Sequence, residues 1–381
     1  MRILVVARRM YFKESQRGIN VITSTFVEQG DKVDFLRVRP LSSFLNSEFY
    51  KLWFSGEKKD RVVTYAYPEL FNRGSITGSF ENNFFDFLKN LRLVKLSKID
   101  LEDYDFVVLE SGEAILNLDL IPSEKLIYRQ SDPVELILSD NQRLIEIERR
   151  LIDKARLTLV ANEKIYNFYQ QNLPDLTKNM EVWRNGFLIN ETIDMKNPYE
   201  EGSVNGVYFG INSIDWATVK ILVENNKDIN FYVIGLKPDS CPLKEYDNLK
   251  LCGFIPHGEA LKYLKYADFV FLPFSKKDIS SSKYQYQSVP SGKFNIFMYY
   301  KLPTVTYDYG RLKEYEQFGF YTAKNREEFI EKFNFLKDKG FEKKEYDVDL
   351  ENFQIENRKK DLINIFRKYG IKKISPFSFR F

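Results

Sequence analysis

The chain of 381 residues carries 57 Lys and Arg against 54 Asp and Glu, and this net charge of +3 gives no reason to expect a nucleic-acid partner. Its 44% hydrophobic and 29% charged residues are ordinary for a soluble globular protein, and its length suits two domains. Two cysteines, Cys241 and Cys252, exclude a disulfide scaffold, and the single histidine, His257, argues against a His-rich metal site or a Ser-His-Asp triad. Chemistry is therefore expected to rest on carboxylates and cations.

The first half of the chain alternates strand and helix patterns in the order of a doubly wound domain. The expected strands cover 2–7, 31–38, 105–112, 125–132 and 157–162, and the expected helices cover 18–29 and about 140–153. Residues 40–100 are less regular and rich in aromatic side chains. Ligands of such folds bind at the carboxyl ends of parallel strands, where the first loop, 8–18, lacks a GxGxxG dinucleotide motif.

A second alternation begins after a change in composition. Pro, Gly, Asn and Glu accumulate in KNPYEEGSVNG (196–206), which predicts a domain boundary. The expected strands then cover 206–210, 230–235, 249–255, 268–274 and 303–308, and the expected helices cover 215–226, 258–267 and a stretch from about 293. We therefore expect an α/β protein with two Rossmann-like domains facing across a cleft, and a C-terminal helix packing back across both. The predicted divisions are a first domain at 1–200, a second domain at 201–350, and the helix and tail at 351–381.

Ordered motifs in both halves resemble glycosyltransferases of the GT-B class. The segment LKLCGFIPHGEALKYLKYADFVFLPF combines a glycine turn, an amphipathic helix, Ala-Asp and a strand ending in proline, as in the nucleotide-sugar half of those enzymes. With VVLESG, YRQSD, VYFGINSID and SGKFNIFMYYKLP, the chain resembles the GumK-type membrane-associated glucuronosyltransferase family from Arg2 to about Leu336. The resemblance implies an inverting, metal-independent transfer from a UDP-sugar, with glucuronic acid as the best guess, to a polyprenyl-diphosphate-linked glycan in exopolysaccharide or capsule synthesis. The resemblance also implies that the domain at 1–200 binds the acceptor and that the domain at 201–350 binds the nucleotide sugar. No cofactor is expected.

Asp132 is the expected catalytic base. In the resembled family the aspartate of the Arg-x-Ser-Asp motif has this role, and Asp132 matches it. A carboxylate at a strand's carboxyl end, stopped by Pro133, is placed to accept a proton from an attacking hydroxyl. The residues alone favour a helix cap or an Asp-Pro turn. Glu110 and Glu113 follow another strand and are candidates on the acceptor side, although a helix-start carboxylate is as good an interpretation.

Lys293 is the expected contact to the donor diphosphate. The resemblance implies this role for a lysine in a small-residue turn that opens a helix, and Lys293 follows Ser291 and Gly292. Backbone N–H groups at a helix start bind anions, and an adjacent ammonium adds charge. Without the resemblance, an exposed lysine at a glycine turn is the simpler interpretation.

Other donor-binding candidates follow the predicted strands of the second half or lie in the long loop before Lys293. They are Gly210, Asn212, Phe254, Ile255, Phe274 and Tyr286. Phe254 stands where the resembled family has a glutamate, and Phe274 where it has a tyrosine. Asn212 fits a turn or a cap equally well, and the side chains of Phe254 and Ile255 also fit a core.

Membrane contact is predicted from the segment 82–99, which places Lys and Arg beside Phe and Leu on a helical pattern. An ordinary packed helix with a basic face is the alternative. The apolar run at the amino terminus has only five residues and no long uncharged apolar stretch occurs, so we expect a cytoplasmic protein peripherally bound to the inner face of the cell membrane. Asp347 and Asp349 form a DxD in a charged stretch, and no metal site is expected there.

Two other functions remain compatible with the sequence. One is a GT-B transferase that uses another donor or a retaining course. The other is a noncatalytic nucleotide- or glycan-binding partner of a synthase complex, which the Phe254 departure favours. The anomeric configuration of a product and calorimetry with UDP-sugars would separate these functions.

Overall fold

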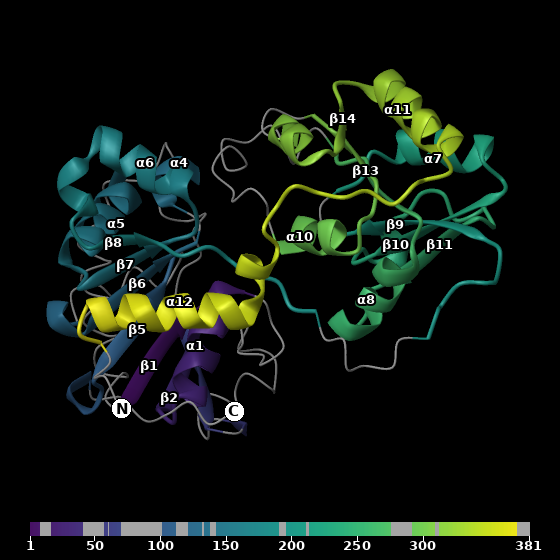
Figure 1. Cartoon of the computed structure of the whole chain (residues 1–381). Coiled ribbons are helices and arrows are strands. Elements are labelled where there is room, and N and C mark those ends of the chain that lie inside the picture. Colours follow the sequence, from purple (N-terminus) through teal and green to yellow (C-terminus); the bar gives the residue numbers. More distant parts are fainter. Residues whose placement is uncertain are drawn as a thin grey trace. The chain divides into compact units, whose positions relative to one another are not determined.

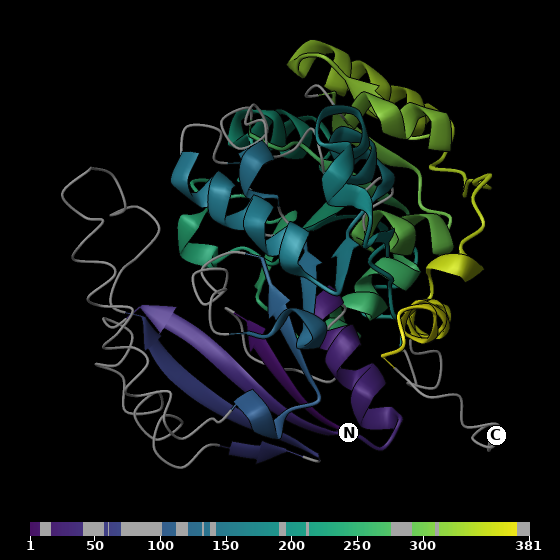
Figure 2. The same ribbon diagram turned by 90° about the vertical axis from the view of Figure 1, so that its left-hand side faces the viewer.

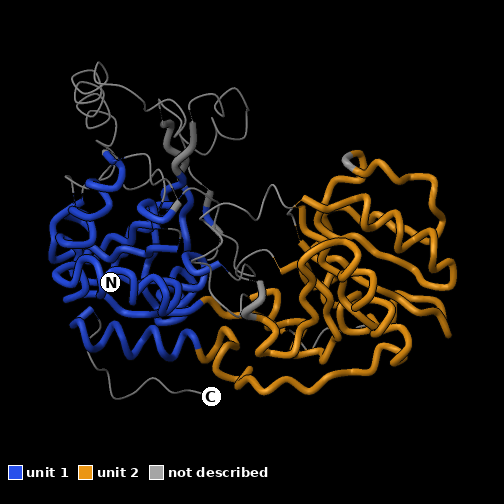
Figure 3. Tube along the Cα trace, turned by 90° about the horizontal axis from the view of Figure 1, so that it is seen from above, with its two compact units in different colours: residues 1–184, 358–381 blue, residues 185–357 orange. Residues whose placement is uncertain are grey.

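The protein is described by a computed structural model, in which the chain forms two compact units. The first unit comprises residues 1–184 and 358–381, and the second comprises residues 185–357 (Figure 3). Contacts therefore divide the chain at 184/185, ahead of the division at 200/201 read from composition, and group most of the C-terminal helix with the first unit. The structure describes residues 1–7, 17–40, 57–59, 61–69, 101–111, 121–131, 133–137, 142–189, 196–210, 213–275, 292–308 and 312–371.

The first unit contains an eight-stranded sheet in the order β3-β4-β2-β1-β5-β6-β7-β8 (Figure 1). The strands are β1 Arg2–Ala7, β2 Lys32–Pro40, β3 Glu57–Lys59, β4 Val62–Glu69, β5 Phe106–Glu110, β6 Leu126–Gln130, β7 Leu157–Val160 and β8 Met180–Val182. All neighbours pair in parallel except β3, which runs antiparallel to β4. Figure 2 shows the long strands β2 and β4 side by side. The inner strands read as continuous apolar runs because both faces are buried.

Helices of the first unit connect and cover these strands. They are α1 Gly18–Glu28, α4 Val134–Ile137, α5 Gln142–Lys154, α6 Glu163–Asn172 and α12 Ile355–Lys368, with 3₁₀ turns at Leu101–Asp103, Ser123–Lys125 and Pro174–Thr177. The helix α12 returns the chain to this unit. The ring of Phe366 stacks on Phe26 of α1 at 5.0 Å, and the indole N–H of Trp183 donates to the carbonyl of Arg358 at 2.9 Å.

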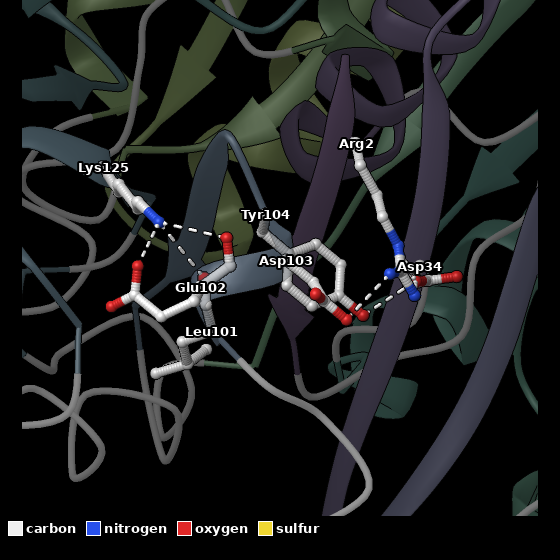
Figure 4. Close-up of polar contacts among 7 residues, drawn as sticks. All are labelled: Arg2, Asp34, Leu101, Glu102, Asp103, Tyr104 and Lys125. Atoms are coloured by element: carbon white, nitrogen blue, oxygen red, sulfur yellow. Dashed lines mark hydrogen bonds and ion pairs between the residues drawn. The ribbon is translucent and has the colours of Figure 1, made fainter.

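A polar cluster ties together the amino ends of strands in the first unit (Figure 4). Arg2 donates to the carboxylate of Asp34 at 3.0 and 3.2 Å, and the Tyr104 hydroxyl donates to the same oxygen at 2.7 Å. Arg2 also reaches Asp103 at 3.2 Å, and Lys125 reaches Glu102 at 3.2 Å. These groups lie at the sheet edge opposite the carboxyl ends, so we assign them to stability.

The second unit contains a six-stranded parallel sheet in the order β11-β10-β9-β12-β13-β14. The strands are β9 Val204–Phe209, β10 Ile229–Ile234, β11 Leu249–Gly253, β12 Phe269–Leu272, β13 Thr304–Tyr307 and β14 Tyr321–Ala323. The helices are α7 Trp216–Asn225, α8 His257–Tyr266, α10 Gly292–Tyr299 and α11 Arg326–Asp338, with 3₁₀ turns at Pro238–Ser240, Leu312–Phe318 and Glu351–Phe353.

Aromatic side chains fill the core of the second unit. Phe269 stacks on Phe341 at 4.3 Å between ring centres and meets Phe231 and Phe333 edge-on at 6.1 and 5.5 Å. Gly206 makes room for this cluster, because a Cβ there would lie 2.2 Å from the Phe269 ring. Part of the 16% aromatic content of the chain therefore serves packing.

Several elements were not predicted from the sequence. The strands β8 and β14 have three residues each, and β3 and β4 lie in the stretch that looks irregular. The strand β6 ends at Gln130, so Asp132 follows the strand by two residues instead of ending it. No helix within the described ranges is long and apolar enough to span a bilayer.

Candidate active site

Glycine turns stand side by side at the carboxyl edge of the second unit's sheet. Gly210, after β9, donates its N–H to the carbonyl of Ile234 at 3.0 Å, and Gly235, after β10, donates to Gly253 at 2.8 Å. Gly235 has φ +103, and a Cβ there would lie 2.4 Å from the carbonyl oxygen of Gly210. The two turns approach each other too closely for any side chain at Gly235.

The loops that follow β9 and β12 are joined by their backbones. Ile214 and Phe274 form an antiparallel bridge. The Ser275 N–H donates to the Ser213 carbonyl at 2.8 Å, and the Asp215 N–H donates to the Pro273 carbonyl at 2.7 Å. This pairing fixes Phe274, whose side chain is only 2% exposed.

Lys293, in the first turn of α10, lies against these loops. Its ammonium is 4.6 Å from the ring centre of Phe274 and 5.4 Å from that of Phe294. A Cβ placed on Gly210 would lie 3.5 Å from the same ammonium and 3.6 Å from the hydroxyl of Tyr208. The structure therefore brings the predicted residues Gly210, Phe274 and Lys293 together, and adds Tyr208, which the sequence did not single out.

Burial lowers the pKa of Lys293 from 10.5 to about 8. Removal of water disfavours the charged form of the lysine. Cation–π contact with the two aromatic rings restores only part of the stabilisation that water gave to the ammonium. An anion bound beside this ammonium would restore the charged form. The arrangement, an ammonium over a glycine turn at the start of a helix, is chemically suited to a phosphate group.

Asp215 holds the loop after β9 to two other elements. Its carboxylate caps α7 through the Ala217 N–H at 3.2 Å and accepts from Tyr307 of β13 and Arg326 of α11, each at 3.1 Å. Burial acts to raise the pKa of Asp215, but hydrogen bonds from Thr218, Arg326 and Tyr307 lower it overall. The sequence gives no sign of the links to Tyr307 and Arg326, because these residues lie 92 and 111 residues from Asp215.

The other predicted donor-side residues have distinct positions. Phe254, directly after β11, is 66% exposed, so its interpretation as a core side chain is wrong. Ile255 is partly buried, and Gly292 begins α10. Asn212, Tyr286 and Ser291 lie outside the described residues.

On the first unit, Glu110 is the last residue of β5 and is partly exposed. Asp132 and Glu113 lie outside the described residues, but both flanks of Asp132 are described. Ser131 donates its N–H to the Ser111 hydroxyl at 3.2 Å, which links the ends of β5 and β6.

Arg129, in the motif YRQSD, is a buried structural residue. It is 0% exposed and donates to the carbonyls of Leu159 and Trp183 at 3.2 and 2.9 Å. Its guanidinium also lies 4.8 Å from the Trp183 ring centre. An arginine in a buried strand is unusual, and this was the signal in the sequence that such an anchor exists.

Glu148 of α5 is a second buried charged residue beside β6, and the sequence analysis missed it. It is 0% exposed and accepts from the Tyr128 hydroxyl at 2.6 Å and from the Val134 N–H at 2.7 Å. Burial raises its pKa from 4.5 to about 7, although hydrogen bonds from Tyr128, Gln130 and the backbone partly oppose this effect.

A metal ion would need several His, Cys, Asp or Glu side chains together, and the described ranges contain no group of three. Of the DxD pair, Asp347 is exposed, and Asp349 accepts a hydrogen bond from the side-chain amide of Asn352.

Comparison with known proteins agrees with this architecture. Residues 5–161 match the family described as "Glucuronosyltransferase GumK, N-terminal domain". The sucrose-phosphate synthase of Thermosynechococcus elongatus is similar at 12% identity, over 97% of this chain and 99% of that chain, with TM-score 0.62. WaaG, a glycosyltransferase involved in lipopolysaccharide biosynthesis, is similar at 12% identity over 97% and 99%, with TM-score 0.55. The UDP-GlcNAc 2-epimerase of Neisseria meningitidis, bound to UDP-GlcNAc, is similar at 13% over 97% and 100%, with TM-score 0.56. No curated protein sequence matches the chain.

Two parallel sheets with flanking helices, similar to solved structures along almost the whole chain, define the GT-B fold and confirm the expected fold class. The family match assigns residues 5–161 to a GumK-type N-terminal domain. The whole chain thus has the GT-B fold, and its similarity to the GumK family is shown for residues 5–161.

Proposed function

We propose that the protein is an inverting, metal-independent transferase that moves glucuronic acid from UDP-glucuronic acid to a polyprenyl-diphosphate-linked glycan in exopolysaccharide or capsule synthesis. The observation that carries the proposal is the GumK match over residues 5–161, a span that contains Asp132. The position of Lys293 in the second unit supports a diphosphate donor.

In the proposed reaction, Asp132 is the general base. An acceptor hydroxyl attacks the anomeric carbon from the face opposite UDP, and its proton passes to the Asp132 carboxylate. The new C–O bond forms as the bond between the anomeric carbon and the diphosphate oxygen breaks. This displacement inverts the anomeric configuration. An aspartate of ordinary pKa, about 3.9, is ionised at neutral pH and ready to accept the proton.

Lys293 is proposed to neutralise the departing diphosphate. Its ammonium lies against two aromatic rings, close to Gly210 and in the first turn of α10, and burial lowers its pKa. A phosphate at this place would regain for the ammonium the stabilisation that burial removes. Ser291 and Gly292 would add backbone N–H donors, and Asn212 and Tyr286 are further candidate contacts to the donor.

The remaining assignments concern the uracil and the acceptor. Phe254 and Ile255 are proposed to present backbone groups to the uracil, with the exposed Phe254 ring beside it. Glu110 and Glu113 are proposed on the acceptor side, where they assist Asp132 or bind the glycan.

The test is a donor panel followed by one substitution. Isothermal titration with UDP and GDP, and turnover with UDP-glucuronic acid, UDP-glucose and UDP-GlcNAc on a synthetic polyprenyl-diphosphate-linked oligosaccharide, should select UDP and glucuronic acid. Asp132→Asn should abolish transfer and leave UDP affinity within about twofold, because the base does not hold the nucleotide. Normal turnover by Asp132→Asn would refute the assignment, and a product of retained configuration would refute the inverting course.

Peripheral membrane binding is proposed from the basic and aromatic segment 82–99, which lies outside the described residues. Liposomes with anionic lipid should retain the protein at low salt, and neutral liposomes should retain less, because lysine and arginine are attracted to anionic headgroups. Equal failure on both kinds of liposome would contradict this part of the proposal.

A further inference from the structure

The strand that leads to Asp132 has two differently anchored faces. Side chains alternate along a strand, so Tyr128 and Gln130 share one face and Arg129 takes the other. Arg129 is held by backbone carbonyls and by Trp183, whereas the face of Tyr128 and Gln130 meets α5 and α6. All three side chains are 0% exposed. The backbone just before Asp132 is therefore fixed from both sides.

Glu148 joins this strand to the residues beyond Asp132. Oε1 accepts from the Tyr128 hydroxyl at 2.6 Å, and Oε2 accepts from the Val134 N–H at 2.7 Å. Tyr128 comes four residues before Asp132 and Val134 two residues after it. A single carboxylate thus holds both flanks of the segment, with one oxygen for each.

We propose that Glu148 is the positioning residue of this active site: its ionised carboxylate clamps Tyr128 and Val134 and so sets the place of Asp132 for proton transfer. The inference rests on the proposed function, because it takes Asp132 as the base. It deepens that function, since it assigns the support of the base to a helix that no sequence motif marks.

Only the ionised carboxylate offers an accepting oxygen to each flank. Once the Glu148 carboxyl is protonated, one of its oxygens carries a hydrogen. That O–H either faces the Val134 N–H, so that two donors meet, or donates to the Tyr128 hydroxyl, which then acts as the acceptor. Burial raises the pKa of Glu148 to about 7, so the clamp forms as pH rises through neutrality. The titratable and charged groups around it are Tyr128 of β6, Tyr169 of α6, Glu135 of α4 and Arg149 of α5, with the amide of Gln130 between Glu148 and Tyr169.

These neighbours do not replace Glu148 in its role. Glu135 pairs with Arg149, which donates to it through Nε at 3.1 Å. Burial raises the pKa of Tyr169 well above its ordinary value, so that this side chain stays neutral. Among the described residues that contact Tyr128 and Val134, Glu148 is accordingly the group whose pKa lies near neutral pH.

The first experiment measures the clamp without any substrate. Hydrogen–deuterium exchange gives the protection factor of the Val134 amide in the full chain at pH 6 and pH 8. We expect Glu148→Ala to reduce protection at pH 8 by about tenfold or more, because the amide loses its acceptor. Glu148→Gln, which resembles the protonated acid, should lower the protection at pH 8 toward the value that the wild type shows at pH 6. Unchanged protection in Glu148→Ala would overturn the inference.

The second experiment measures turnover of UDP-glucuronic acid with the same polyprenyl-diphosphate-linked oligosaccharide. We expect the wild-type kcat to rise as pH increases through about 7, and Glu148→Ala to lose about 10- to 100-fold in kcat with little change in the donor KM. Glu148→Gln, which like the protonated acid has one accepting oxygen and one donor, should keep kcat near the lower wild-type value of acidic pH and lose the inflection near pH 7, a change that a purely structural role would not cause. An inflection that persists in Glu148→Gln would overturn the inference.

Two controls separate the possible failures. Tyr128→Phe deletes only the hydroxyl that donates to Glu148, and should lower kcat less than Glu148→Ala does. This variant tests the clamp even if Glu148→Ala folds poorly. If Asp132→Asn keeps turnover, the proposed base is wrong, and the exchange of the Val134 amide still decides whether Glu148 clamps the segment. If Asp132→Asn is inactive and Glu148→Ala is normal, only the positioning inference fails.

Discussion

Proton uptake on UDP binding is the most direct test of the proposed contact between Lys293 and the donor diphosphate. Burial lowers its pKa from 10.5 to about 8, which at ~1.4 kcal/mol per pKa unit disfavours the charged form by about 3 kcal/mol. A bound diphosphate should reverse this effect, because the opposite charge stabilises the ammonium. At pH 8.5 about three quarters of the free protein carries neutral Lys293, so UDP binding should take up ~0.8 proton.

The same linkage fixes how affinity depends on pH. UDP should bind about tenfold more weakly at pH 9 than at pH 7, since part of the binding energy is then spent on protonating the lysine. Isothermal titration at pH 8.5 in buffers of different ionisation enthalpy measures the uptake directly. Lys293→Met should abolish both the uptake and the pH dependence, and Lys250→Met, a change at an exposed lysine on β11, should preserve them. A wild-type titration without uptake, or uptake that survives in Lys293→Met, would refute the reasoning.

Three further predictions concern stability and the donor loops. Gly235→Ala should destabilise the second unit by about 2–4 kcal/mol and weaken UDP binding, because the new Cβ would lie 2.4 Å from the carbonyl oxygen of Gly210 and the backbone has φ +103. Thermal melts and UDP titration measure the two effects, and an unchanged melting temperature would contradict the argument. Asp215→Asn should lower the free energy of unfolding by about 1–3 kcal/mol at pH 7 and by less at pH 3, because the lowered pKa of Asp215 adds stability that is lost as pH falls. Urea denaturation measures this effect, and an equal loss at both pH values would count against the prediction. The free energy of unfolding of the wild-type protein should fall by up to about 3 kcal/mol as pH rises from 4.5 to about 7, because Glu148 binds its proton more tightly in the folded protein than in the unfolded chain. The Glu148→Gln variant should lack this fall. Parallel curves of unfolding free energy against pH for the two proteins would disprove the prediction.

The order of the main strands and helices was predictable from the sequence. The strand at 2–7 was expected and is observed at Arg2–Ala7, and the helix expected at 258–267 is observed at His257–Tyr266. Parallel strands buried on both faces leave continuous apolar runs, and amphipathic helices leave a periodic stripe, so each such element marks itself locally. The strands β8 and β14 were not predictable, because three residues are too few to show any period.

The residues of the candidate site also differ in how far they could be predicted from local sequence patterns. Lys293 and Gly210 were found because a glycine turn at a strand or helix end is visible in the sequence and because the motifs resemble a known family. The sequence could not give the long-range partners of Arg129, Glu148 and Asp215, since these partners lie 14 to 111 residues away. The sequence by itself determined where strands, helices and turns form, because these follow from local periodicity and backbone preference. Only the tertiary structure decided which buried charges meet, because desolvation and pairing depend on side chains that folding brings together from distant parts of the chain.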